Sequence, residues 1–206
     1  MPRVTFWYEF ASTYSYLTAM RIDQVAQAAG VEVTWQPFLL GPIFKAQGWP
    51  TSPFNIYPAK GRYMVRDVAR LAEARGLPFR MPDPFPANSL KAARLALVGC
   101  QEDWVAPFSK AMFDAEFAQG ADISSEAVLG SILAKLGLDG PALMARSNSP
   151  EIKDRLRAVT SEAEQRGIFG APSFVAEDGE LFWGDGWRLH WSTQKSSRFP
   201  LCSMII

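Results

Sequence analysis

The chain of 206 residues has only two cysteines and one histidine. Cys100 and Cys202 lie about half the chain apart, so there is no CxxC pair for disulfide exchange and no thiolate set for zinc. Cys100 ends an apolar helical pattern and is predicted to be a small buried side chain. His190 has no evident carboxylate partner, so we do not expect it to act as a general base. The sequence therefore predicts neither cysteine redox chemistry nor a metal site.

An excess of charge of one sign is also missing. The chain has 21 basic and 21 acidic residues and no long run of either sign, which argues against binding to nucleic acid or to an anionic membrane surface. No apolar stretch approaches the roughly 20 residues that span a bilayer, and the start lacks the pattern of a secretory signal. We expect a soluble cytoplasmic protein.

What the chain does contain is a strand–helix–strand pattern at its start. An apolar run over Val4–Phe10 predicts a strand, residues 13–29 predict one helix ending before Gly30, and alternation over Val31–Phe38 predicts a second strand. Such a unit favours parallel pairing with a right-handed crossover. Near the other end, Asp178-Gly179 between two apolar runs predicts a β-hairpin that Pro172 precedes.

The segment between these parts is mainly helical. Residues 41–58 are rich in Gly, Pro and aromatic residues and predict a loop or a short helix, while residues 80–87 are a proline-rich connector. Ser149 followed by Pro150 predicts the start of the last of these helices. The helical patterns cover Tyr63–Ala74, Leu90–Gln101, Trp104–Phe117, Glu126–Leu136 and Glu151–Arg166.

Ser12 follows the first predicted strand and precedes the first predicted helix. Free backbone N–H groups and the positive end of the helix dipole favour an anion at such a turn, whether carboxylate, phosphate or thiolate. Ser12 could equally be an ordinary helix cap. Lys45 could be a solvated side chain, Asn55 could satisfy a turn, and the bond before Pro172 could be trans or cis.

Taken together, the motifs resemble one family. They comprise Phe10-Ala11-Ser12-Thr13-Tyr14-Ser15-Tyr16-Leu17, Lys45 and Asn55 at their relative spacing, Phe169-Gly170-Ala171-Pro172-Ser173-Phe174, and Phe182-Trp183-Gly184-Asp185. With the order of elements, this pattern is similar to the 2-hydroxychromene-2-carboxylate isomerases and kappa-class glutathione transferases, which have a DsbA-like thioredoxin fold. The similarity extends to about residue 189, and residues 190–206 show no clear helical period.

The resemblance implies an α/β fold, a thioredoxin-like sheet with a large helical insertion. Residues 1–40 and 167–206 would form the thioredoxin-like domain, and residues 41–166 the insertion with its connecting helix. It also implies a site for reduced glutathione in which Ser12 is the catalytic residue beside the sulfur. Lys45, Asn55, the backbone of Ala171 before a cis Pro172, and the segment Trp183-Gly184-Asp185 would bind the tripeptide.

The function implied is a glutathione-dependent cis–trans isomerase acting on a small aromatic-catabolic intermediate, with no redox cofactor and with a homodimer as the expected assembly. Two alternatives stay open. A kappa-class-like transferase would release the glutathione conjugate from the same site, and a non-catalytic glutathione- or peptide-binding module would bind without activating the thiol. A disulfide oxidoreductase fits least, because Ser12 and Ser15 cannot cycle electrons.

Overall fold

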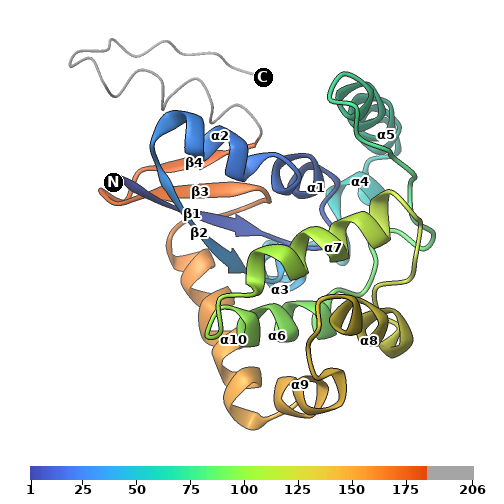
Figure 1. The fold of residues 1–206 in the computed structure, drawn as a ribbon. Coiled ribbons are helices and arrows are strands. Elements are labelled where there is room, and N and C mark those ends of the chain that lie inside the picture. Colours follow the sequence, from blue (N-terminus) through green and yellow to red (C-terminus); the bar gives the residue numbers. More distant parts are fainter. Residues whose placement is uncertain (185–206) are drawn as a thin grey trace.

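The structure, a computed structural model, describes residues 1–184, and its centre is a mixed β-sheet (Figure 1). The strands of this region are β1 (Arg3–Tyr8), β2 (Glu32–Pro37), β3 (Ser173–Ala176) and β4 (Leu181–Trp183), in the order β2-β1-β3-β4. β1 pairs with β2 in parallel, whereas β3 is antiparallel to both β1 and β4. The predicted parallel unit and the hairpin are therefore confirmed.

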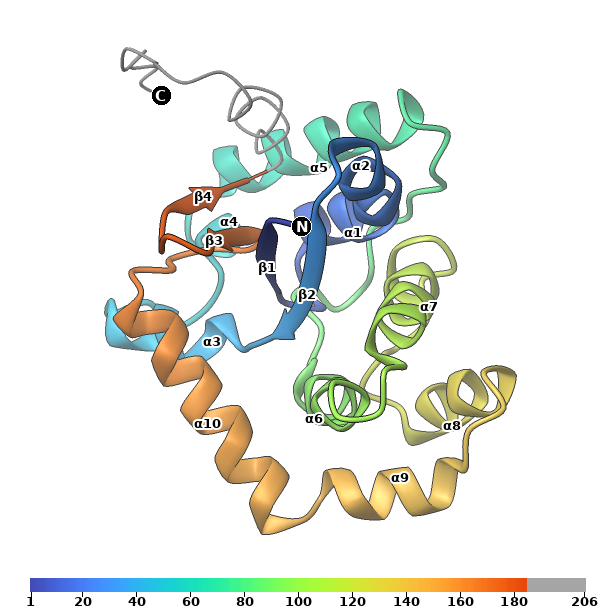
Figure 2. The same ribbon diagram turned by 60° about the vertical axis from the view of Figure 1, so that its left-hand side comes forward.

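Ten helices accompany the sheet in residues 1–184, and most of them lie between β2 and β3 in the chain (Figure 2). They are α1 (Thr13–Ala19), α2 (Ile22–Ala29), α3 (Leu40–Ala46), α4 (Pro53–Ile56), α5 (Pro58–Glu73), α6 (Leu90–Gly99), α7 (Val105–Phe117), α8 (Glu126–Lys135), α9 (Gly140–Ser147) and α10 (Pro150–Gln165). No helix in this region combines the length and the apolar character needed to cross a membrane. The division of the chain into two domains stays a prediction.

One prediction about the helices was wrong, and one helix was missed. The single helix expected over residues 13–29 is two helices, because Arg21 has φ −136° and ψ −7° and interrupts the helical backbone. The helix α9 was not predicted, since Gly140-Pro141 looks like a turn; in the structure Pro141 lies in the first turn of the helix and Asp139 caps it by accepting from the N–H of Ala142.

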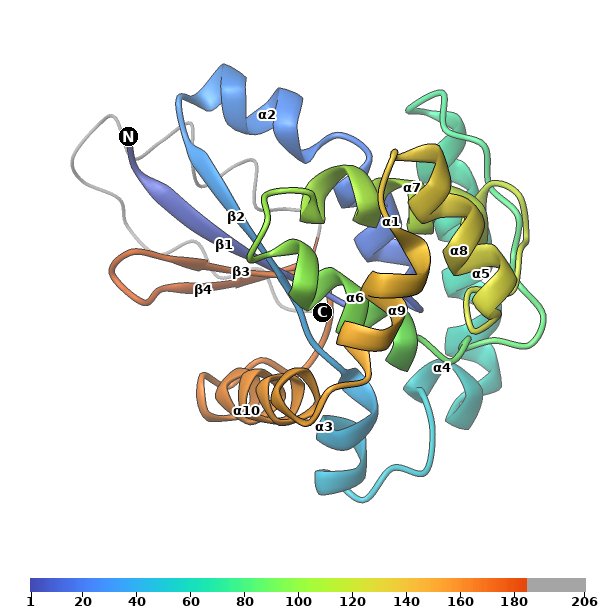
Figure 3. The same ribbon diagram turned by 60° about the horizontal axis from the view of Figure 1, so that its bottom comes forward.

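The two faces of the sheet are covered by different helices, as Figure 3 shows with α2 and α10 on opposite sides. Alternate residues of a strand point to opposite faces. Phe6 of β1 belongs to the larger core, which includes residues of α1, α6 and α7, whereas its neighbour Trp7 packs with Ala163 of α10 and Val175 of β3. The carboxyl end of β1, where the chain turns into α1, lies between the helices that cover the two faces of the sheet.

The entry to α10 allows a direct stability test. Ser149 accepts a hydrogen bond from the N–H of Ile152, as the sequence predicts. We expect Ser149→Ala to lower the free energy of unfolding by about 1 kcal/mol, because it leaves that N–H without its cap. Chemical denaturation would measure it. Ser161→Ala, an exposed change within the same helix, is the control; equal losses in both variants would contradict the capping argument.

Candidate functional site

Ser12 connects the start of α1 to the loop that leads into β3. Its hydroxyl accepts a hydrogen bond from the N–H of Ser15 at 3.1 Å and donates to the carbonyl oxygen of Ala171 at 2.9 Å. Its own N–H donates to the carbonyl of Glu9 at 3.0 Å. The capping hypothesis for Ser12 is therefore confirmed, and the half-buried hydroxyl lies against the backbone of a residue 159 positions away.

The Ala171–Pro172 peptide bond is cis, as predicted. Pro172 is buried and its carbonyl accepts from the N–H of Gly184 at 2.9 Å, while the Ser173 hydroxyl donates to the carbonyl of Gly170 at 2.8 Å. These bonds fix the backbone of this loop on both sides of Ala171, whose carbonyl faces the Ser12 hydroxyl.

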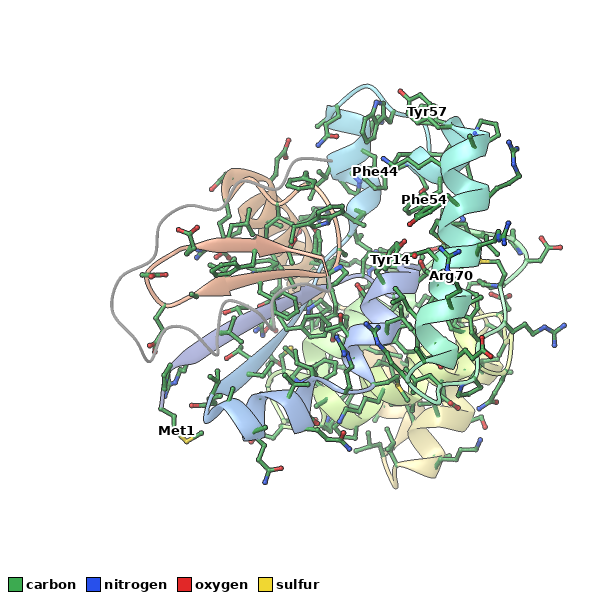
Figure 4. All side chains as sticks on the ribbon, turned by 90° about the horizontal axis from the view of Figure 1, so that it is seen from above. Met1, Tyr14, Phe44, Phe54, Tyr57 and Arg70 are labelled. Atoms are coloured by element: carbon green, nitrogen blue, oxygen red, sulfur yellow. The ribbon has the colours of Figure 1, made fainter. Side chains whose placement is uncertain are left out.

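The helical insertion holds α1 in place. The Tyr14 hydroxyl donates to Asp67 on α5 at 2.9 Å, and the Thr13 hydroxyl lies 3.4 Å from the sulfur of Met64 on the same helix. Figure 4 shows Tyr14 of α1 in the part of the molecule bounded by α5 and by Phe44 of α3. The turn that carries Ser12 is thus supported from the sheet and from the insertion.

Lys45 and Asn55 differ in their surroundings. Lys45 is exposed near the end of α3, and no hydrogen bond or ion pair engages its ammonium within residues 1–184. Asn55 on α4 is exposed too, but its amide donates to the carbonyl of Phe85 at 3.1 Å and to the Thr51 hydroxyl at 3.4 Å. Asn55 therefore fastens the proline-rich connector to α4, and its role toward a ligand stays a prediction.

Trp183 ends β4 and is 58% exposed, with its ring 5.2 Å from that of Phe169. Gly170 lies so close to it that a Cβ there would come within 2.5 Å of the Trp183 Nε1. Gly184 has φ +81°, which favours glycine. Asp185, His190, Cys202 and the tail after residue 189 lie outside the described residues.

Sequence reasoning missed Glu9, three positions before Ser12. Glu9 is 7% exposed, and its side chain accepts a hydrogen bond from the Ser89 hydroxyl. Burial raises the pKa of this carboxyl from 4.5 to about 7, although the bonds from Ser89 and from the backbone of Ala11 oppose the shift. An acidic residue inside the apolar run over Val4–Phe10, three positions before Ser12, was the available signal. No group of three or more His, Cys, Asp or Glu side chains in the described part of the chain could hold a metal ion.

This buried carboxyl predicts a pH dependence of stability. Because the folded chain keeps the Glu9 proton up to about pH 7 whereas the unfolded chain loses it near 4.5, the stabilisation is complete below 4.5 and is lost as the pH rises through 7. We expect the free energy of unfolding to fall over that range, and Glu9→Gln to remove this part of the fall. Denaturation at a series of pH values gives the free energy of unfolding of the wild-type chain and of Glu9→Gln. If this free energy changes with pH in the same way for both, the prediction is contradicted.

Comparison with known proteins adds to this geometry. The model of the DSBA-like thioredoxin domain family matches residues 3–189. The chain belongs to that family. A 2-hydroxychromene-2-carboxylate isomerase of Sphingobium xenophagum is 28% identical over 184 residues, covering 88% of this chain and 92% of the relative. A glutathione S-transferase kappa 2 of Caenorhabditis elegans is 28% identical over 188 residues, covering 85% and 81%.

Among solved structures, a 2-hydroxychromene-2-carboxylate isomerase superimposes with a TM-score of 0.84 at 24% identity, covering 94% of each chain. The DSBA-like thioredoxin fold predicted from the sequence is thereby confirmed, as is the resemblance to these isomerases and to kappa-class transferases. In this DSBA-like chain, residues 12 to 15 read Ser-Thr-Tyr-Ser, without a thiol.

Proposed function

We propose that the chain is a glutathione-dependent cis–trans isomerase of the 2-hydroxychromene-2-carboxylate type. The observation that carries the proposal is the contact between the Ser12 hydroxyl and the carbonyl of Ala171 beside a cis proline. It brings a hydroxyl that can donate to sulfur next to a carbonyl that can accept a peptide N–H. Relatives named as this isomerase and as kappa transferases support a glutathione-related isomerase or transferase.

The donor set suits reduced glutathione. Ser12 would face the thiol, the backbone of Ala171 the cysteinyl peptide group, and the free ammonium of Lys45 a carboxylate of the tripeptide. Asn55 and the segment Trp183-Gly184-Asp185 would complete the contacts. When bound, glutathione supplies a thiolate that adds reversibly to an electrophilic conjugated carbon, so that a bond can rotate before the thiolate leaves.

The chain's part is to favour the ionised thiol. The Ser12 hydroxyl has one proton, and in the structure it points to Ala171. A peptide N–H that bonds to the Ala171 carbonyl would free this proton to turn toward sulfur, while the N–H of Ser15 continues to donate to the serine oxygen. A hydrogen bond to a charged group contributes about 1.5–3 kcal/mol, which is enough to lower a thiol pKa of ~8.5 by about one unit or more.

The test is product analysis with 2-hydroxychromene-2-carboxylate and reduced glutathione. An isomerase converts the substrate and returns all of the glutathione, and Ser12→Ala slows the conversion. Consumption of glutathione into a stable adduct would instead identify the transferase that the kappa relatives suggest. Binding of glutathione with no turnover and no change in the thiol pKa would identify the non-catalytic module. The small aromatic substrate, the homodimer and the cytoplasmic location expected from the sequence belong to this proposal.

A further inference from the structure

A groove of about 300 Å³ lies between α3, α6 and α10, outside the site described above. The helix α10 packs against both α3 and α6, so that residues of all three helices can line one depression (Figure 2). None of the residues assigned to glutathione is among them. Sites for small molecules have volumes of about 300–1,000 Å³, and the groove therefore has room for one small organic molecule.

Part of the groove is apolar. Leu39 before α3, Leu90 on α6 and Leu156 on α10 contribute to this part. The N–H of Leu39 donates to the Thr160 hydroxyl at 3.3 Å, and this bond joins the start of α3 to α10. Leu156 is buried, whereas Leu39 and Leu90 are half-buried. A hydrocarbon ring lying on these side chains would remove their remaining surface from water.

Three cationic side chains also line the groove, Arg94 on α6 and Lys153 and Arg157 on α10. Lys153 is half-buried, and no hydrogen bond or ion pair engages its ammonium within residues 1–184. Arg94 donates from Nη1 to the Asn148 side chain at 3.4 Å, but its buried Nε has no partner in that part of the chain. Arg157 is exposed and pairs with Asp154. The protein itself thus uses only part of the capacity of this cluster to bind an anion.

The spacing of these cations is unfavourable without an anion. Lys153 and Arg157 are four residues apart on one helix, and like charges at this spacing destabilise a helix. Glu164 is the acidic side chain in the described lining. A rise of 1.5 Å per residue places its Cα about 16 Å along α10 from that of Lys153, which is beyond the screening length of about 8–10 Å in physiological salt. The Lys153 end of the groove is therefore cationic.

We propose that this groove is a second binding site, separate from Ser12, for a small organic acid in which a carboxylate is attached to a flat apolar ring. The carboxylate would accept charge-assisted hydrogen bonds from Arg94 and Lys153, which are stronger than bonds between neutral groups. The ring would rest on Leu90 and Leu156. Binding would also offset the repulsion between Lys153 and Arg157, so the charge and the apolar surface of the groove favour the same class of ligand.

The first test uses 2-naphthoate as the probe and the full chain in a calorimetric titration. The matched control is 2-naphthamide, which keeps the ring and loses the charge, and it should bind about tenfold more weakly. Acetate, which keeps the charge and loses the ring, should also bind about tenfold more weakly or less well still. If 2-naphthoate does not bind, or binds no better than either control compound, the proposal is overturned.

The second test changes the cations one at a time. Lys153→Ala and Arg94→Gln should each weaken the binding of 2-naphthoate about tenfold. Lys135→Ala removes the same charge from an exposed position at the end of α8 and should leave the affinity unchanged. Urea denaturation confirms that each variant is folded. Equal affinities in all chains, or equal losses that include Lys135→Ala, would overturn a specific site at this groove.

NMR of the backbone amides separates the groove from the glutathione site. The signals of Leu39, Leu156 and Thr160 should shift when 2-naphthoate is added, and Ser12→Ala should leave these shifts unchanged. If the shifts occur at Ser12 and Ser15 instead, the acid enters the site already described and the second site is overturned. Failure of glutathione to bind would contradict the proposed function and leave this result as it stands.

Discussion

Ser12→Ala is expected to raise the pKa of the bound glutathione thiol by about one unit and to reduce turnover roughly tenfold, because the hydroxyl proton that would stabilise the thiolate is lost. Titration of the thiolate absorbance gives the pKa, and the initial rate of isomerisation gives the turnover. When the fraction of ionised thiol limits the rate, the increase in the thiol pKa should account for the whole decrease in turnover.

The substitution also removes a helix cap, so a control must separate stability from chemistry. Ser149→Ala makes the same chemical change at the start of α10, where the hydroxyl caps Ile152. It should cost a similar ~1 kcal/mol of stability and leave the thiol pKa where it was. A thiol pKa that Ser12→Ala does not change, or that Ser149→Ala changes equally, would contradict the assigned role.

The largest loss of stability is expected from Phe113→Ala, which should lower the free energy of unfolding by about 3–5 kcal/mol. Phe113 has no exposed surface, and its ring centroid lies 5.2 Å from that of Phe10 and 5.9 Å from that of Tyr8. The substitution leaves a cavity where α7 packs against the end of β1. Urea denaturation monitored by circular dichroism measures the change.

Phe169→Ala is the matched control for this prediction. Phe169 is 49% exposed and contacts Trp183 at the surface, so its truncation should cost less than about 1 kcal/mol. Similar losses for the two variants would mean that the Phe113 side chain is not part of a tightly packed core.

The sequence predicted the parts that local chemistry determines. The alternation of β2 and the Asp178-Gly179 turn specify pairing and connection within short segments. The cap at Ser149 needs only a hydroxyl next to a proline and a helical run. The cis bond before Pro172 was predicted through the family pattern, because composition gives only a low expectation for it.

The missed features depend on contacts between distant segments. Nothing at Met20-Arg21 resembles a helix breaker; the interruption lies between α1, which packs against α5 and α7, and α2, which packs against β2. Asn55 bonds to a carbonyl 30 residues away, a pairing that no local pattern indicates. Glu9 was overlooked because its hydrogen-bond partner, Ser89, lies 80 positions further along the chain. The available signal was an acidic residue close to the candidate serine, and no hydrophobic period indicates such a residue.

Ser12 and Ala171 lie 159 positions apart in the sequence, and this distance along the chain has a consequence for folding during synthesis. The ribosome completes β1 long before β3, its partner in the middle of the sheet, so during synthesis one edge of β1 has no strand to pair with. Open strand edges promote aggregation in incomplete chains. That edge of β1 gains its partner only after residue 173 has emerged. The hydrogen bond between the Ser12 hydroxyl and the Ala171 carbonyl can therefore form only late in synthesis.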